Sequence, residues 1–287
     1  MHAHTDRVLR ELKRARIELQ AVARTTLPCA IRAFGRIEAR LSRPLRVAIV
    51  GEFNSGKSSL ANLLVGIESL PTAVVSSTRI PTLLYHALRP EIWATRHNGR
   101  REQLRAAKEA REQSIIQLEV GLPSARLREM QILDLPGLAN PRFERRLGDL
   151  FLQNVDVVLW CTVSIQAWKE SERAAWDRVP ARLRGRALLV VTHGDLVREA
   201  ADKRKLLRRL QKEAVSFRDV VLISTNEALA SMREERKGLT APALDASGAN
   251  ALESALAKLL LSVRQHRTKA AIAVTRRIAQ AALSRLE

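Results

Sequence analysis

The sequence is poor in several features that other classes of protein require. It has only two cysteines, Cys29 and Cys161, too few for a disulfide framework, which favours a reducing, cytosolic setting. Aromatic residues make up 3% of the chain, and Tyr85 is the single tyrosine. Because single-stranded nucleic acid is bound largely by stacking on aromatic side chains, this scarcity disfavours binding of that kind, although contacts to phosphate alone remain open. No apolar run reaches the ~18–20 residues that span a bilayer, and the first residues lack the apolar core of a signal peptide.

Positive charge is what the sequence has in excess. Lysine and arginine number 49 against 30 aspartates and glutamates, which gives a net charge of +19. Such an excess indicates anionic partners rather than a fold, and an anionic membrane surface, RNA or an acidic protein would all fit it. Codon bias toward arginine and alanine is another explanation. With 46% apolar residues over 287 positions, the chain can build a substantial core.

Three regions differ in the spacing of their apolar residues. Residues 1–43 repeat them at three- and four-residue steps, which predicts an N-terminal helical segment interrupted near Pro28. Residues 44–248 alternate short β-rich runs with helix-like sequence, which predicts an α/β fold with a doubly wound, mainly parallel sheet. Residues 249–287 return to helical spacing in two stretches, Asn250–Val263 and Lys269–Leu286, and are expected to pack with the N-terminal segment as a short bundle. The expected strands are Arg46–Val50, Met130–Leu133, Val155–Cys161, Ala187–Val191 and Val220–Ile223.

Further extended segments are expected between the first two of these strands. Ile115–Leu122 and Arg128–Leu133 flank a Pro-Ser pair, which predicts a hairpin. Ile92–Thr95 precedes an Asn-Gly turn and predicts an edge element, followed by a charged helix around Arg101–Arg111.

The strongest motif follows the first expected strand and precedes a helix-like segment. Its letters Gly-Glu-Phe-Asn-Ser-Gly-Lys-Ser match the pattern G-x-x-x-x-G-K-[ST]. The two glycines allow a tight loop whose N–H groups surround phosphates, and the helix N-terminus adds its dipole. Lys57 would reach the terminal phosphates, and the Ser58 hydroxyl would bind Mg²⁺. The residues expected to hold the phosphates are Gly51, Asn54, Ser55, Gly56, Lys57, Ser58 and Ser59.

Three polar segments follow later strands. Asp134, in Asp-Leu-Pro-Gly, can hold a Mg²⁺-bound water, and the Gly137 N–H can face a γ-phosphate. Thr192-His193-Gly194-Asp195 places a carboxylate that can accept both the ring N–H and the amino group of guanine, a donor pair that adenine lacks. Ser224 and Thr225 follow the next strand, where a loop beside the base is expected.

Together these segments resemble the GTPase superfamily, and their details resemble bacterial dynamin-like proteins over about residues 45–262. Leu70–Thr72 and Thr78–Thr82 resemble the first switch of that family, and Gln166–Trp168 with Ser171-Glu172 resembles the stretch after the following strand. The resemblance implies a P-loop GTPase domain with GTP and GDP as substrate and product. Switch segments around residues 72–82 and 137–146 would order with GTP.

The resemblance also implies roles for single residues. Ser58 and Thr78 would hold Mg²⁺, with Asp134 acting through water. Lys57, Ser58, Thr78 and Gly137 would form the catalytic set, and Thr192, His193, Asp195, Ser224 and Thr225 would bind the base.

Two positions depart from the family pattern. His193 stands where the family usually has a lysine whose stem packs along the phosphate loop and the base. Phe53 stands where eukaryotic dynamins carry a catalytic glutamine, and its side chain cannot orient an attacking water. We therefore expect slow hydrolysis by the isolated chain and stimulation when two nucleotide domains pair face to face.

The partners expected are a second copy, a larger dynamin-like GTPase or an anionic membrane surface, with a cytoplasmic location, peripheral at the inner face of the membrane. The C-terminal helix combines Lys269, Arg276 and Arg277 with apolar residues, which suits a lipid surface, but its many alanines favour packing within a bundle. Two alternatives remain: a ribosome- or RNA-associated small GTPase, and a GTP-binding regulatory subunit with little hydrolysis of its own.

Overall fold

The computed structural model describes residues 2–22, 28–66, 80–105, 114–138, 152–236 and 244–283. Contacts within the chain divide it into two compact units, one of residues 1–44 and 261–287 and the other of residues 45–260. Within the ranges given above, no helix is both long and apolar enough to cross a membrane.

The elements follow one another in an order typical of an α/β domain preceded and followed by helices. The strands are β1 (Leu45–Gly51), β2 (Thr82–His86), β3 (Glu91–Arg96), β4 (Arg101–Gln103), β5 (Ile115–Leu122), β6 (Met130–Asp134), β7 (Val157–Val163), β8 (Ala187–Thr192) and β9 (Asp219–Leu222). The helices are α1 (His2–Val22), α2 (Pro28–Ser42), α3 (Lys57–Val65), α5 (Arg126–Glu129), α7 (Glu170–Trp176), α8 (Ala181–Arg184), α9 (Ala200–Glu213), α10 (Thr225–Arg236), α11 (Leu244–Ser247) and α12 (Ala249–Leu283). Two short 3₁₀ turns, η3 (Ser164–Gln166) and η4 (Gly194–Leu196), follow β7 and β8.

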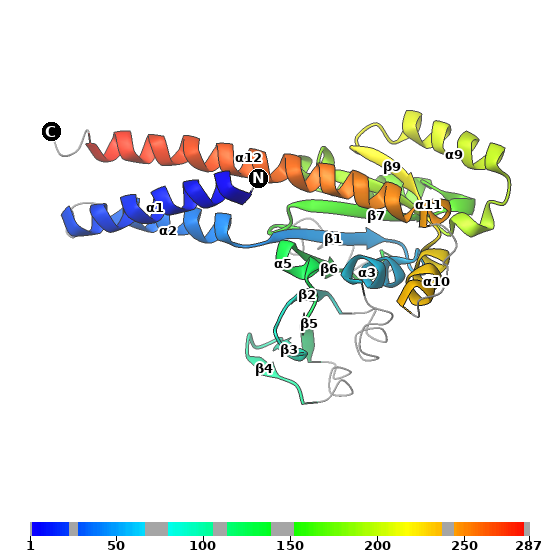
Figure 1. Ribbon diagram of the computed structural model, residues 1–287, viewed down its shortest axis with the longest axis horizontal. Coiled ribbons are helices and arrows are strands. Elements are labelled where there is room, and N and C mark those ends of the chain that lie inside the picture. The colour runs from blue at the N-terminus through cyan, green and yellow to red at the C-terminus, as the bar shows by residue number, and fades with distance from the viewer. Residues whose placement is uncertain are drawn as a thin grey trace. The chain divides into compact units, whose positions relative to one another are not determined.

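A mainly parallel sheet forms the centre of the 45–260 unit (Figure 1). In the described residues it has nine strands in the order β4-β3-β5-β2-β6-β1-β7-β8-β9. Strands β6, β1, β7, β8 and β9 run parallel, as do β2 and β5, whereas β2 is antiparallel to β6 and β3 is antiparallel to both β4 and β5. The predicted α/β fold with a doubly wound, mainly parallel sheet is confirmed.

Helices cover both faces of this sheet, which explains why its central strands are apolar along their whole length. Side chains alternate between the faces of a strand, so Val50 and Trp160 share one face, where they pack with residues of α7, α8 and α9. Ile49 and Leu159 point to the opposite face, where α3 contacts β1. All four side chains are fully buried, as a parallel sheet covered on both faces requires.

The other unit is helical. Phe34 of α2 is buried with Leu12 of α1 and Ala271 of α12 in one apolar cluster. The Arg267 guanidinium of α12 donates to the Arg43 carbonyl, which directly follows α2, at 2.8 Å and so joins these two helices. Pro28 begins α2, so the interruption expected near this residue separates two helices.

Four details differ from the sequence-based expectation. The expected hairpin of Ile115–Leu122 and Arg128–Leu133 is wrong, because β2 lies between β5 and β6 in the sheet. The expected helix around Arg101–Arg111 is wrong at its start, where β4 pairs with β3 across a turn at Gly99. Strand β2 was not anticipated. The two helical stretches expected after residue 249 form the single helix α12.

Candidate nucleotide-binding site

The loop between β1 and α3 has left-handed backbone angles at Asn54 and Gly56, the geometry of a tight turn before a helix. Gly56 lies immediately before α3 with a φ of 77°, a left-handed conformation that costs little only for glycine. Its Cα faces the Thr192 side chain so closely that a Cβ would lie 3.3 Å from the threonine Cβ. Asn54 also has a positive φ, 58°, which asparagine tolerates better than most residues. The loop therefore turns sharply and leads into the N-terminus of a helix, where N–H groups lack partners within the helix.

Lys57 lies inside this loop. Its Nζ donates to the Glu52 carbonyl oxygen at 2.5 Å, and the Ser55 hydroxyl donates to the same oxygen at 2.8 Å. Lys57 is 7% exposed, and burial lowers its pKa, although the nearby carboxylates of Asp134 and Glu52 act in the opposite direction. A phosphate entering the loop would offer this ammonium a charged acceptor in place of a carbonyl.

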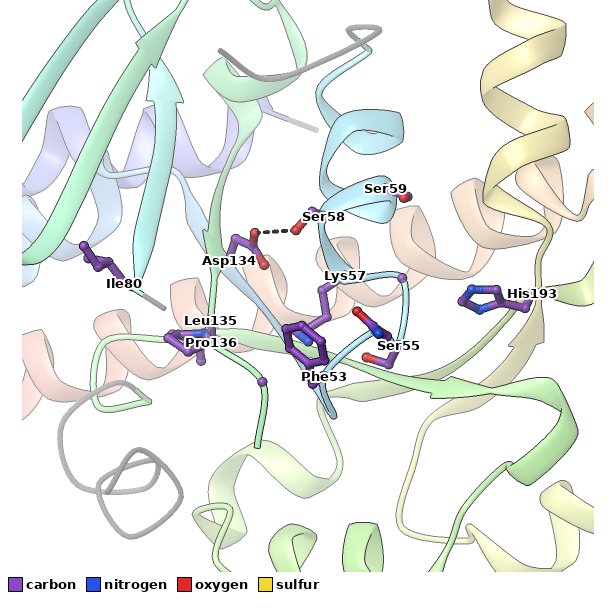
Figure 2. A pocket seen from close by; sticks show the side chains of 13 residues that line it. Phe53, Ser55, Lys57, Ser58, Ser59, Ile80, Asp134, Leu135, Pro136 and His193 are labelled. Atoms are coloured by element: carbon purple, nitrogen blue, oxygen red, sulfur yellow. Dashed lines mark hydrogen bonds between the residues drawn. The ribbon is translucent and has the colours of Figure 1, made fainter. Parts of the chain in front are cut away.

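Ser58 and Asp134 form a hydrogen-bonded pair near Lys57 (Figure 2). The Ser58 hydroxyl donates to Oδ2 of Asp134 at 3.3 Å. Oδ1 of Asp134 is buried and has no hydrogen-bond partner among the described residues. Burial raises the pKa of Asp134 to about 6, while the Lys57 charge and the Ser58 hydrogen bond act in the opposite direction.

These oxygens fit Mg²⁺, which prefers one or two protein oxygen ligands together with substrate phosphates and waters. A buried carboxylate oxygen without a partner is the group that such an ion or its water would satisfy. In the described ranges, no cluster of three or more histidine, cysteine or acidic side chains could hold a metal by itself. Thr78, the other expected ligand, lies outside the described residues.

The loop and the Asp134–Gly137 segment line one cavity of about 360 Å³. Gly137 approaches the loop so closely that a Cβ there would lie 2.8 Å from the Phe53 nitrogen. Any residue other than glycine at this position would therefore force the backbone of the loop to move. The Phe53 side chain is 60% exposed at this cavity, and His193 lines the end of it that lies away from Ile80 and Pro136 (Figure 2). The lining residues include the expected phosphate ligands Asn54, Ser55, Gly56, Lys57, Ser58 and Ser59, while Gly51 ends β1 beneath the loop.

Hydrogen bonds connect the segments expected to bind the base with the loop and with one another. The Thr192 hydroxyl lies 3.0 Å from the Ser55 carbonyl and 3.0 Å from Nδ1 of His193, so it can donate to one and accept from the other. Ser224 donates through Oγ to Oδ1 of Asp195 at 2.9 Å. Oδ2 of Asp195 has no hydrogen-bond partner in the part of the chain that the structure describes. Asp195, Ser224 and Thr225 do not line the phosphate cavity; they lie at the adjacent ends of β8 and β9.

One group of residues at the loop was not anticipated from the sequence. The carboxylate of Glu52 accepts hydrogen bonds from Nζ of Lys169, at 2.6 Å, and from Oγ of Ser171, at 2.7 Å. The donors come from the turn into α7 and are more than a hundred positions away along the chain. The sequence signals were the acid inside the loop and the family resemblance of the segment around Ser171, and neither of them identifies the donors.

The family model that matches is described as the dynamin family, and it covers residues 47–194. The isoniazid-induced protein IniC of Mycobacterium tuberculosis is 35% identical over 114 residues, 37% of this chain and 23% of the relative. Dynamin-like protein 2 of Campylobacter jejuni is 32% identical over 151 residues, 47% of this chain and 23% of the relative.

A solved structure of an oligomerised bacterial dynamin pair shares the fold at a TM-score of 0.70 and 17% identity. The match covers 99% of this chain and 47% of that structure. The chain thus spans less than a quarter of the length of both curated relatives and under half of this structural neighbour. Since the family model covers more than half of the present sequence, the chain belongs to the dynamin family and carries the GTPase domain of that family.

Proposed function

We propose that this chain binds GTP together with Mg²⁺ and hydrolyses it to GDP and phosphate as a nucleotide-dependent switch. The supporting observation is that a phosphate loop and the Asp195–Ser224 pair lie at the same end of the parallel strands. The Thr192 hydroxyl, in contact with the Ser55 carbonyl, joins the two parts. This arrangement offers phosphate ligands and a guanine acceptor to one ligand.

The residues of the loop would act on the triphosphate. Lys57 would exchange the Glu52 carbonyl for phosphate oxygens and so stabilise the charge that develops during hydrolysis. Ser58 and Thr78 would hold Mg²⁺, and Asp134 would accept a hydrogen bond from its water. The ion, when bound, neutralises charge on the β- and γ-phosphates. The Gly137 N–H would face the γ-phosphate.

The residues after β8 and β9 would select the base. Asp195 would accept two hydrogen bonds from guanine while Ser224 holds the carboxylate in orientation. The His193 ring would pack against the base, as the aliphatic stem of a lysine does elsewhere in the family. Adenine would leave the Asp195 carboxylate unpaired, and that cost provides the discrimination.

Hydrolysis is expected to depend on protein concentration. The Phe53 side chain has no hydrogen-bonding group, so it cannot orient the attacking water in an isolated domain. A second domain that pairs with the first can supply a group that does so. We expect the turnover number for GTP to rise at least about fivefold between dilute and concentrated protein, by analogy with other trans-acting groups. ATP should not be hydrolysed. Steady-state phosphate release across a concentration series measures this, and a flat profile would rule out pairing as the trigger.

We also propose that the nucleotide state is relayed through the helical ends to a membrane surface or to a dynamin-like partner. Helix α12 contributes residues to both compact units and so connects them covalently. The oligomerised bacterial dynamin pair is described as sensing and tethering membranes, which suggests the class of target. On α9, the basic side chains Arg204, Lys205, Arg208 and Lys212 are exposed, and among the described residues none of them has a charged partner.

Flotation with lipid vesicles tests this proposal. We expect the chain to float with vesicles that contain phosphatidylserine, and more strongly with GTP than with GDP or without nucleotide. Each basic residue near an anionic surface contributes about 1 kcal/mol, so replacing Arg204 and Arg208 with glutamate should reduce binding clearly. Phosphatidylcholine vesicles serve as the control. Retention on RNA, with no flotation, would favour the ribosome-associated alternative.

A further inference from the structure

Glu52 places a carboxylate in a loop that, under the proposed function, receives a triphosphate. Its charge is close enough to the ammonium of Lys57 that the two influence each other's pKa. The Glu52 carboxylate and an incoming phosphate are both negative and repel each other. Without a compensating cation, Glu52 would therefore oppose the entry of phosphate.

The structure supplies the compensation from outside the loop. Lys169 forms an ion pair with Oε2 of Glu52 at 2.6 Å, and Ser171 donates to Oε1 at 2.7 Å. Burial tends to raise the pKa of Glu52, but the hydrogen bonds and the charges of Lys169 and Lys57 outweigh it and lower the pKa. The carboxylate is therefore ionised at neutral pH, and it has a cation beside it.

Lys169 comes from a turn that is held in place by buried contacts. Trp168 precedes it with a φ of 64°, and its backbone N–H donates to the Thr162 hydroxyl at 3.0 Å. The Lys169 N–H and the Thr162 hydroxyl both donate to the buried carboxylate of Glu172, at 3.0 and 2.8 Å. The Trp168 ring packs edge-on against Trp160 at 6.2 Å. The backbone of Lys169 is thus fixed, and its side chain reaches a defined point on the loop.

Glu52 binds two lysines in different ways. Its carbonyl oxygen accepts from Lys57 and its carboxylate pairs with Lys169. When phosphate draws Lys57 away from the carbonyl, Lys169 is the cation that stays with Glu52. The requirement for Lys169 is therefore greatest in the nucleotide-bound state.

We propose that Lys169 determines the affinity of the site for nucleotide phosphates by neutralising Glu52. This inference rests on the proposed function. Lys169 acts through Glu52 and is a positioning residue, since no contact between Lys169 and the nucleotide is required. A different explanation is that the ion pair merely holds the loop in shape.

Four proteins distinguish charge compensation from mechanical support: wild type, Lys169→Ala, Glu52→Gln, and the double variant. The probe is a non-hydrolysable fluorescent analogue of GTP, titrated with Mg²⁺ at low and at 0.5 M salt. We expect Lys169→Ala to weaken binding about three- to tenfold at low salt, the range for a partly exposed charge pair. Glu52→Gln should bind as well as wild type or better, and the double variant should return to within about twofold of wild type. The loss should shrink at high salt because exposed charges are screened.

Controls separate this effect from loss of structure. Lys169→Arg should restore binding, and Lys212→Ala on α9 should leave it unchanged. Melting temperatures of all variants show whether the fold is kept. If Glu52→Gln weakens binding as much as Lys169→Ala and the double variant does not recover, the ion pair is a mechanical support and the proposal is wrong. If wild type itself binds no GTP analogue, the proposed function fails instead, and the two failures are therefore distinguishable.

Discussion

Lys57→Ala should lower the affinity for GTP about 100-fold or more and abolish hydrolysis. The ammonium of Lys57 would make charge-assisted hydrogen bonds to the terminal phosphates, and each such bond is worth about 1.5–3 kcal/mol. No other described cation lines the phosphate cavity, so none can substitute. Isothermal titration with GTP and GDP measures the loss directly.

The fold should tolerate this change. Burial already disfavours the charged form of Lys57, and the substitution removes a desolvated ammonium together with one hydrogen bond to a carbonyl. Lys205→Ala, an exposed lysine of α9, removes the same charge away from the cavity and should bind GTP normally. GTP affinity within twofold of wild type for Lys57→Ala would overturn the assignment of the phosphate loop.

Asp195→Asn should exchange guanine preference for xanthine preference. The carboxylate offers two acceptors, which match the N1–H and the 2-amino group of guanine. An asparagine amide offers one acceptor and one donor, which match the N1–H and the 2-oxo group of xanthine. We expect about 100-fold weaker binding of GTP and a gain for xanthosine triphosphate, since each mismatched polar pair leaves a group unsatisfied.

Competition between the two nucleotides for the same protein gives the measurement. Asp202→Asn, at an exposed position of α9, makes the same chemical change away from the site and should leave GTP preference intact. Ser224→Ala should produce a smaller loss in the same direction, because only the orientation of the carboxylate is relaxed. An unchanged preference in Asp195→Asn would exclude this residue from base recognition.

The central strands and the tight loop between β1 and α3 could be predicted because their signals are local. Buried parallel strands appear as short apolar runs, and the spacing of Gly51, Gly56 and Lys57 is fixed by the geometry of one loop. Pro28 marked the start of α2 because proline interrupts a helix but is tolerated in the first turn of the next one. Local residue chemistry is sufficient in each case.

The errors arise where non-local pairing decides the structure. Ile115–Leu122 and Arg128–Leu133 are neighbours in sequence, yet β2 separates them in the sheet, and no local pattern encodes that insertion. Residues after Arg101 have a helical composition but pair with β3, because the turn at Gly99 brings the two segments together. Tertiary pairing outweighs local propensity at such positions.

The same limit applies to the site. The carboxylate of Asp134 and the hydroxyl of Ser58 could each be selected from a motif, but their 3.3 Å contact depends on β6 lying beside β1. Lys169 and Ser171, the partners of Glu52, lie in a segment that resembles the family in sequence. That resemblance did not indicate that the segment contacts the loop. Composition cannot show which of many lysines meets which of many acids.

The cluster of aromatic rings beneath the turn at Trp168 has a practical consequence for spectroscopy. Trp160, Trp168 and Trp176 are three of the four tryptophans, and their ring centroids lie 5.3–6.3 Å apart, edge to face. Most of the tryptophan absorbance of the protein therefore arises at one place, next to the residue that pairs with Glu52. Only Trp93, on a distant strand of the sheet, adds a separate signal, so the native chain carries its own optical reporter without any attached dye.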